Sequence, residues 1–68
     1  MTPLIFNRIK AVLAERQKSN NFLAEHLKVN VNTVSQWCTN KKQPSIETLF
    51  AIAKVLDVDV RELLVSTK

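Results

Sequence analysis

Hydrophobic residues recur at helical spacing along most of the chain, separated by short polar segments. Two such patterned segments lie close together within residues 19–44. Their apolar positions are Leu23, Ala24 and Leu27 in the first and Val34 and Trp37 in the second. The three residues between them, 28–30, are too few for anything but a turn. The pattern therefore predicts two short helices joined by a tight turn.

These two helices have clear start signals. Ser19 and Asn30 are residue types that cap helix starts, so we expect one helix from Ser19 to about residue 28 and another from Asn30 to about residue 39. Asn40 follows, and asparagine tolerates the left-handed conformation that often ends a helix. Residues 41–44 should form a loop, because Pro44 pushes the residue before it away from helical geometry.

Further helices are predicted on both sides of this pair. Thr2-Pro3 is typical of a helix start, for a first helix reaching about Arg16. Ser45 can cap a fourth helix, and Asp59 with Glu62 forms a capping box for a fifth. The apolar positions of these three helices are Ile5, Ile9, Val12 and Leu13; Ile46, Leu49, Phe50, Ala53 and Leu56; and Val60, Leu63 and Leu64. We therefore expect an all-α fold, a compact five-helix bundle that forms one domain over residues 1–68, with a frayed tail from residue 65.

Length and composition narrow the class of protein. A chain of 68 residues buries only about 60% of its unfolded surface and gains stability from a partner. It has no apolar run long enough to span a membrane and no secretory signal pattern. Its single cysteine cannot form an internal disulfide, which favours the reducing cytoplasm.

The charge is unevenly distributed. Residues 1–45 hold seven Lys and Arg against two acidic residues, a net charge of +5, whereas residues 46–68 hold three against four, a net charge of −1. The first part would attract a polyanion. An ordinary basic protein with solvated lysines would show the same imbalance, so charge alone leaves both interpretations open.

The outer face of the segment after Asn30 helps to decide between these two interpretations of the charge. It carries uncharged side chains that can form hydrogen bonds or small apolar contacts: Val31, Asn32, Thr33 and Gln36. Lys41 and Lys42 follow in the loop. Two packed helices with such a face and a basic loop are typical of a helix-turn-helix that reads DNA.

The chain also resembles the Cro-like phage-repressor family of helix-turn-helix regulators, also called the XRE family. The resemblance covers about residues 7–64, and its most specific parts are FLAEHLKVNVNTVSQW, TNKKQPS and IAKVLDVDVRELL. It implies a five-helix bundle, usually a dimer, whose third helix enters the major groove of double-stranded DNA at a short inverted-repeat operator. The implied function is a transcriptional regulator, most simply a repressor.

The resemblance also assigns roles to residues by position. The implied base contacts are Val31, Asn32, Thr33 and Gln36. The implied phosphate contacts are Asn20, Thr39, Asn40 and Lys41, and the charge of Lys42 adds it to this set. Arg16 and Lys18 are further candidates for the DNA backbone.

Two departures from the family pattern have structural consequences. Lys28 stands at a frequent turn glycine, so a positive φ there would cost about 1 kcal/mol. Leu13 and Cys38 stand where many members pair an arginine with a glutamate. Because both charges are replaced by apolar groups, we predict that Leu13 and Cys38 touch.

Leu63, Leu64 and Val65 offer more apolar surface than a small bundle can bury, which predicts a homodimer surface. The same fold could instead be a protein-interaction module, such as an antitoxin, an anti-repressor or a restriction–modification controller component. Trp37 is expected in the core and His26 at the surface, and Cys38 is expected to be a half-buried filler. No cofactor, metal site or catalytic arrangement is indicated, so we do not expect an enzyme.

Overall fold

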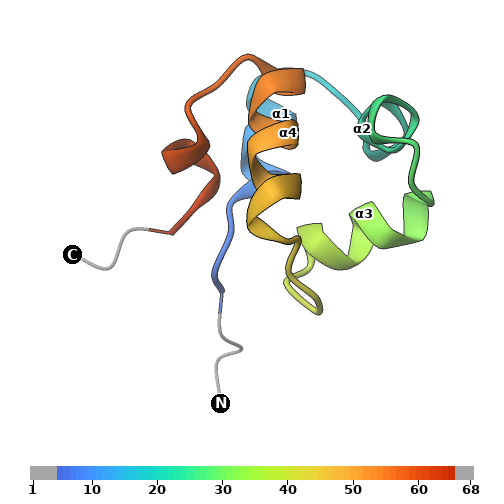
Figure 1. The fold of residues 1–68 in the computed structure, drawn as a ribbon, viewed down its shortest axis with the longest axis horizontal. Helices are drawn as coiled ribbons and strands as arrows, with labels where there is room; N and C mark the ends of the chain where they lie inside the picture. Colours follow the sequence, from blue (N-terminus) through green and yellow to red (C-terminus); the bar gives the residue numbers. More distant parts are fainter. Residues whose placement is uncertain (1–4, 66–68) are drawn as a thin grey trace.

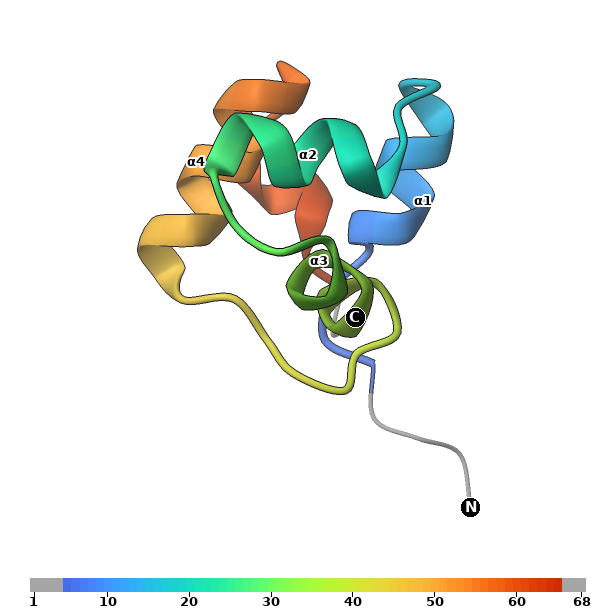
Figure 2. The same cartoon turned by 90° about the vertical axis from the view of Figure 1, so that its right-hand side faces the viewer.

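The computed structural model describes residues 5–65. It contains the helices α1 (Ile9–Glu15), α2 (Asn20–Leu27), α3 (Val31–Cys38) and α4 (Ile46–Leu56), followed by the 3-10 turn η1 (Val60–Leu63). In Figures 1 and 2, α2 and α3 cross steeply on one side of α1 and α4, and η1 lies on the other side. The all-α class is confirmed for the described residues, whereas the expected fifth helix is only one 3-10 turn.

Three of the expected helix starts are confirmed in detail. The Ser19 hydroxyl accepts a hydrogen bond from the Phe22 N–H at 3.1 Å at the start of α2. The Asn30 side chain accepts one from the Asn32 N–H at 2.7 Å and begins α3. Ser45 does the same for α4. These bonds satisfy amide donors that have no partner inside the helix.

The first helix begins later than expected. Thr2-Pro3 lies outside the described residues, but α1 starts only at Ile9, and Ile5 is exposed on extended chain. The reason is a long-range contact: Asn7 forms an isolated antiparallel bridge with Leu64, and the Arg8 N–H donates to the Leu63 carbonyl at 2.8 Å. Pairing with the end of the chain therefore replaces the first helical turns.

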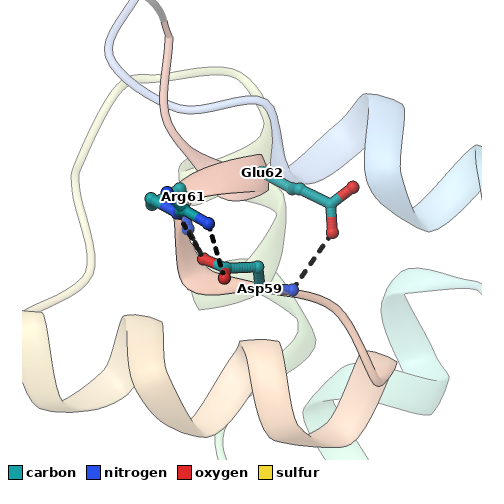
Figure 3. Close-up of polar contacts among 3 residues, drawn as sticks. All are labelled: Asp59, Arg61 and Glu62. Atoms are coloured by element: carbon teal, nitrogen blue, oxygen red, sulfur yellow. Dashed lines mark hydrogen bonds and ion pairs between the residues drawn. The ribbon is translucent and has the colours of Figure 1, made fainter.

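The capping box predicted for the last element is present (Figure 3). The Asp59 carboxylate accepts from the Arg61 N–H, and the Glu62 carboxylate accepts from the Asp59 N–H at 3.1 Å. The Arg61 guanidinium also bonds to both Asp59 oxygens, which lowers the pKa of that carboxyl. The element is short because Leu64 turns to extended geometry to pair with Asn7.

All five elements contribute to one hydrophobic core. Its buried residues are Ile9, Val12, Leu13, Leu23, Ala24, Val34, Trp37, Leu49, Ile52, Ala53, Leu56 and Leu63. Trp37 is thus a core residue, as expected. Leu13 lies in this core and Cys38 packs against it, while a direct contact between the two stays a prediction.

Two expectations about apolar residues are wrong. Leu63 has 0% exposure, so it belongs to the core and cannot form part of a dimer surface; η1 turns it inward. On α4, Ile46 and Phe50 are 69% and 59% exposed. The face of α4 that meets the core carries Leu49, Ala53 and Leu56. Ile46 and Phe50 lie outside this face.

The turn between α2 and α3 has a left-handed residue, Lys28, at the position where a positive φ was considered from the sequence. Lys28 has φ 57° and ψ 45°, and the Val29 N–H donates back to the Ala24 carbonyl at 3.0 Å. This is the usual way for a helix to end on glycine, but here a side chain with a Cβ occupies the position.

We therefore expect Lys28→Gly to raise the free energy of unfolding by about 0.5–1 kcal/mol, because relief of the backbone strain exceeds the entropy that glycine adds to the unfolded chain. Urea denaturation followed by circular dichroism measures the change. Lys28→Ala is the matched control, since it removes the charge but keeps a Cβ. Equal stabilisation by both variants would contradict the backbone explanation.

Candidate nucleic-acid interface

The turn at Lys28 sets α3 across α2 and fixes which of its faces is buried. Val34 and Trp37 are buried in the core to which α2 contributes Leu23 and Ala24, and α2 and α3 pack together. In Figure 1, α3 lies at the edge of the fold. Its opposite face is therefore at the surface.

The sequence-predicted reading residues lie on that outer face. Val31 and Asn32 are exposed, and Thr33 and Gln36 are partly exposed. Asn32 and Gln36 are one turn apart, so their side chains share one side of α3. Within residues 5–65, neither side-chain amide hydrogen-bonds to another residue. The two amides therefore keep their full donor and acceptor capacity for another molecule.

A basic loop, residues 39–44, connects this helix to α4 and passes below α3 in Figure 2. The Lys41 and Lys42 N–H groups both donate to the Gln36 carbonyl, at 3.0 and 3.3 Å, so the loop folds back onto the end of α3. Both lysines are exposed, and neither forms a salt bridge with a residue of the described chain. Two positive charges thus lie next to the uncharged face of α3.

Of the other expected phosphate contacts, Asn20 and Thr39 lie at the surface near α3. Asn20 begins α2, and its side-chain oxygen accepts from the Cys38 thiol at 3.5 Å, which leaves its NH₂ group as a donor. Thr39 is exposed, but its hydroxyl donates back to the Ser35 carbonyl at 3.0 Å. The Thr39 N–H donates to the same carbonyl at 3.0 Å, so both donors of Thr39 are already engaged, and a phosphate oxygen can only accept.

The side chain of Asn40 does not lie where a phosphate contact would require it. It has the expected left-handed conformation, with φ 60°. Its side chain, however, turns away from solvent to the N-terminal segment, where its oxygen accepts from the Phe6 and Asn7 N–H groups. A phosphate-contacting role for the Asn40 side chain therefore has no support in its geometry.

Two further polar residues, Asn7 and Gln43, surround Asn40 and are not indicated by the sequence pattern. Asn7 is buried and bonds to Gln43, and Gln43 in turn bonds to Asn40. Nothing in the local pattern marks these residues, because Asn7 is separated from its partners by more than thirty positions.

Two further basic residues, Arg16 and Lys18, make contacts within the fold. The Arg16 guanidinium donates to the Asp57 carbonyl at 3.1 Å, and the Lys18 ammonium lies 4.7 Å from the centre of the Phe22 ring. Both side chains remain exposed. Because both side chains make contacts within the fold, they are weaker candidates for DNA than Lys41 and Lys42.

Cys38 and His26 are where the sequence placed them. Cys38 is half-buried, and burial raises the pKa of its thiol against a small opposing effect of Lys10. A raised pKa keeps the less reactive thiol form at neutral pH. His26 is exposed and lies against Phe22 on α2, with ring centres 4.2 Å apart.

Residues 5–65 contain no group of three His, Cys, Asp or Glu side chains able to hold a metal ion. Among the helices of this part, none has the length and apolar character to cross a membrane. The α3 face beside the basic loop is therefore the candidate binding site of the described chain.

Comparison with known proteins agrees with this fold. The helix-turn-helix family model matches residues 9–63, so the chain belongs to that family, in its XRE-type form. It is also similar to a crystal structure from Bacteroides fragilis described as a "putative DNA-binding protein". The two share 48% sequence identity with a TM-score of 0.88, covering 91% of this chain and all of the other. No curated protein matches the chain.

Proposed function

We propose that this protein is a sequence-specific DNA-binding transcriptional regulator, acting as a repressor, that binds operator half-sites as a homodimer and reads them with α3. The observation that carries the proposal is the pair of amides Asn32 and Gln36, on the outer face of α3 beside Lys41 and Lys42; neither amide side chain is hydrogen-bonded to another residue between 5 and 65. Membership of the helix-turn-helix family supports it, as does the similarity to the Bacteroides fragilis protein.

The chemistry of the face suits base edges in the major groove. Asparagine and glutamine amides can form paired hydrogen bonds with adenine, each discriminating by about 1–3 kcal/mol. Val31 and the Thr33 methyl suit the methyl group of thymine. The face is uncharged, so these residues would add selectivity rather than general attraction to DNA.

General affinity would come from the phosphate backbone. Lys41 and Lys42 provide charges, and the Asn20 amide at the start of α2 provides a neutral donor. These contacts would fix the register of α3 in the groove but carry no base information.

The homodimer would use an apolar surface formed by the two ends of the described chain. Ile5, Phe6, Leu64 and Val65 are all exposed, and the Val65 N–H donates to the Phe6 carbonyl at 3.1 Å, which brings them together. We call this group the terminal apolar surface. Leu64 and Val65, which the sequence suggests for a dimer surface, belong to this group. In a two-fold dimer the two α3 helices would read half-sites about 34 Å apart.

Selection from a pool of random duplexes tests the proposed function. We expect enrichment of a short inverted repeat, bound with an affinity that falls steeply as salt is raised. Selection without any enriched sequence would contradict the proposal. It would favour the protein-interaction alternative, for which the exposed Ile46 and Phe50 on α4 are the supporting observation.

Lys41→Ala should weaken binding to all duplexes alike. Loss of one phosphate contact per protomer is expected to reduce the slope of log K against log salt by about one for each protomer bound, without changing the ranking of sequences. Fluorescence anisotropy at several salt concentrations measures both quantities. Lys54→Ala, in the last turn of α4, removes the same charge far from the basic loop and serves as control. An equal effect of the two substitutions would show that only net charge matters.

A further inference from the structure

The N-terminal segment, residues 5–8, is held from two sides. On one side it pairs with the end of the chain through the Asn7–Leu64 bridge and the bond from the Val65 N–H to the Phe6 carbonyl. On the other side it meets Asn40, which lies just beyond the end of α3. The segment therefore connects the terminal apolar surface to the basic loop.

Asn40 makes the contact on the loop side. Its side-chain oxygen accepts from the Phe6 N–H at 2.9 Å, the Asn7 N–H at 3.1 Å and the Gln43 amide at 3.1 Å. Its NH₂ group donates to the Asn7 carbonyl at 3.3 Å. The left-handed backbone at this position is what turns the side chain toward the segment, and asparagine adopts it more readily than most residues.

Asn7 completes the arrangement from the buried side. Only 4% of it is exposed, yet each polar atom of its side chain has a partner. Its NH₂ group donates to the Trp37 carbonyl at 3.0 Å and to the Gln43 side-chain oxygen at 2.7 Å, and its oxygen accepts from the Ile9 N–H at 3.1 Å. One side chain thus joins the start of α1, the end of α3 and the basic loop. Such a buried network is stabilising only while all its members are satisfied.

We propose that Asn7, Asn40 and Gln43, the amide cluster, are positioning residues that hold the basic loop in its DNA-binding geometry and couple it to the terminal apolar surface. This inference rests on the proposed function. Asn40 and Gln43 flank Lys41 and Lys42 directly, so the cluster fixes both ends of the segment that carries the two charges. A loop that is already ordered loses less conformational entropy when it meets a phosphate backbone. Asn40 then serves the site by holding the loop, in place of a direct phosphate contact.

The substitution Asn40→Gly removes the side-chain amide of Asn40 but keeps its backbone conformation, so it tests the side chain alone. Glycine accepts φ 60° without strain but supplies no amide, so the end of α3 should stay intact while the cluster loses its centre. We expect amide hydrogen exchange at Phe6 and Asn7 to accelerate by about tenfold or more. We also expect DNA affinity to fall by about three- to tenfold for every duplex, with the ranking of sequences unchanged.

Two further variants complete the experiment. Asp57→Gly places glycine at another left-handed position, at the end of α4, and should change neither the exchange at Phe6 and Asn7 nor the DNA affinity. Gln43→Ala removes a second member of the cluster without altering a left-handed residue, and should reproduce the effects of Asn40→Gly in the same direction. A residue with only a structural role would lower the melting temperature and leave the affinity of the folded protein unchanged.

The outcomes distinguish this inference from the function on which it rests. If the wild-type protein binds its selected duplex and both cluster variants bind it equally well, the positioning role is wrong while the proposed function stands. If exchange at Phe6 and Asn7 is unchanged in Asn40→Gly, the cluster does not hold the segment, and the inference is overturned. If the wild-type protein shows no sequence preference, the proposed function fails and the inference fails with it.

Discussion

Leu63→Ala is expected to lower the free energy of unfolding by about 2–5 kcal/mol. Leu63 is completely buried, and it brings η1 into the core formed by the four α-helices. Truncation removes three carbon atoms from a packed site and leaves a cavity that the short η1 turn can close only in part. Because domains of this size are only marginally stable, much of the protein should be unfolded at 37 °C. Thermal and urea denaturation followed by circular dichroism measure the loss.

Leu64→Ala is the matched control, one residue away. Leu64 is 43% exposed, so its truncation should change the stability of the monomer by only about 0.5 kcal/mol. If Leu64 lies in the proposed dimer surface, the same variant should shift the monomer–dimer equilibrium toward monomer in analytical ultracentrifugation. Equal destabilisation by the two substitutions would contradict the placement of Leu63 and Leu64 on opposite sides of the chain.

Replacing Asn32 and Gln36 together by alanine should abolish most of the sequence preference of the protein. If each amide forms a paired bond with an adenine, each loss removes about 1–3 kcal/mol of discrimination. The double variant should then bind the selected duplex about as well as one with those bases changed. Its stability should be nearly unchanged, because neither amide is bonded to another residue of the described chain.

A double-mutant cycle that combines protein substitutions with base-pair substitutions isolates the contribution of each amide to sequence preference. Asn32→Ala and Gln36→Ala are each measured against the selected duplex and against duplexes with single base-pair substitutions. Each variant should become insensitive at its own base pair and stay sensitive elsewhere, whereas Lys41→Ala should keep the complete ranking. Sensitivity that is unchanged at every base pair would mean that α3 does not read bases through these amides.

What the sequence predicted correctly was encoded locally. Ser19, Asn30 and Ser45 each satisfy an amide within three residues, so the starts of α2, α3 and α4 could be identified from neighbouring positions alone. The capping box at Asp59 is local in the same way. Trp37 was placed in the core from its spacing to Val34, which needs no knowledge of the rest of the fold.

What the sequence did not predict depends on contacts between distant segments. The late start of α1 and the shortening of the last helix have one common cause, the pairing of Asn7 with Leu64. Leu63 lies in the core because η1 turns it inward. The inward turn of Asn40 depends on Phe6 and Asn7, more than thirty residues away. Periodicity and capping rules carry no information on such pairs, so the terminal segments and the amide cluster could be found only in the structure.

The proposed function requires that the Asn32 and Gln36 side chains meet bases in the major groove. Side-chain ¹⁵N–¹H NMR spectra during titration with the selected duplex test it most directly, because each amide NH₂ group gives its own pair of signals. We expect the signals of Asn32 and Gln36 to shift strongly and to saturate at one protomer per half-site, while those of buried Asn7 and of Asn40 change little. Unchanged signals from Asn32 and Gln36 in a saturated complex would contradict the claim.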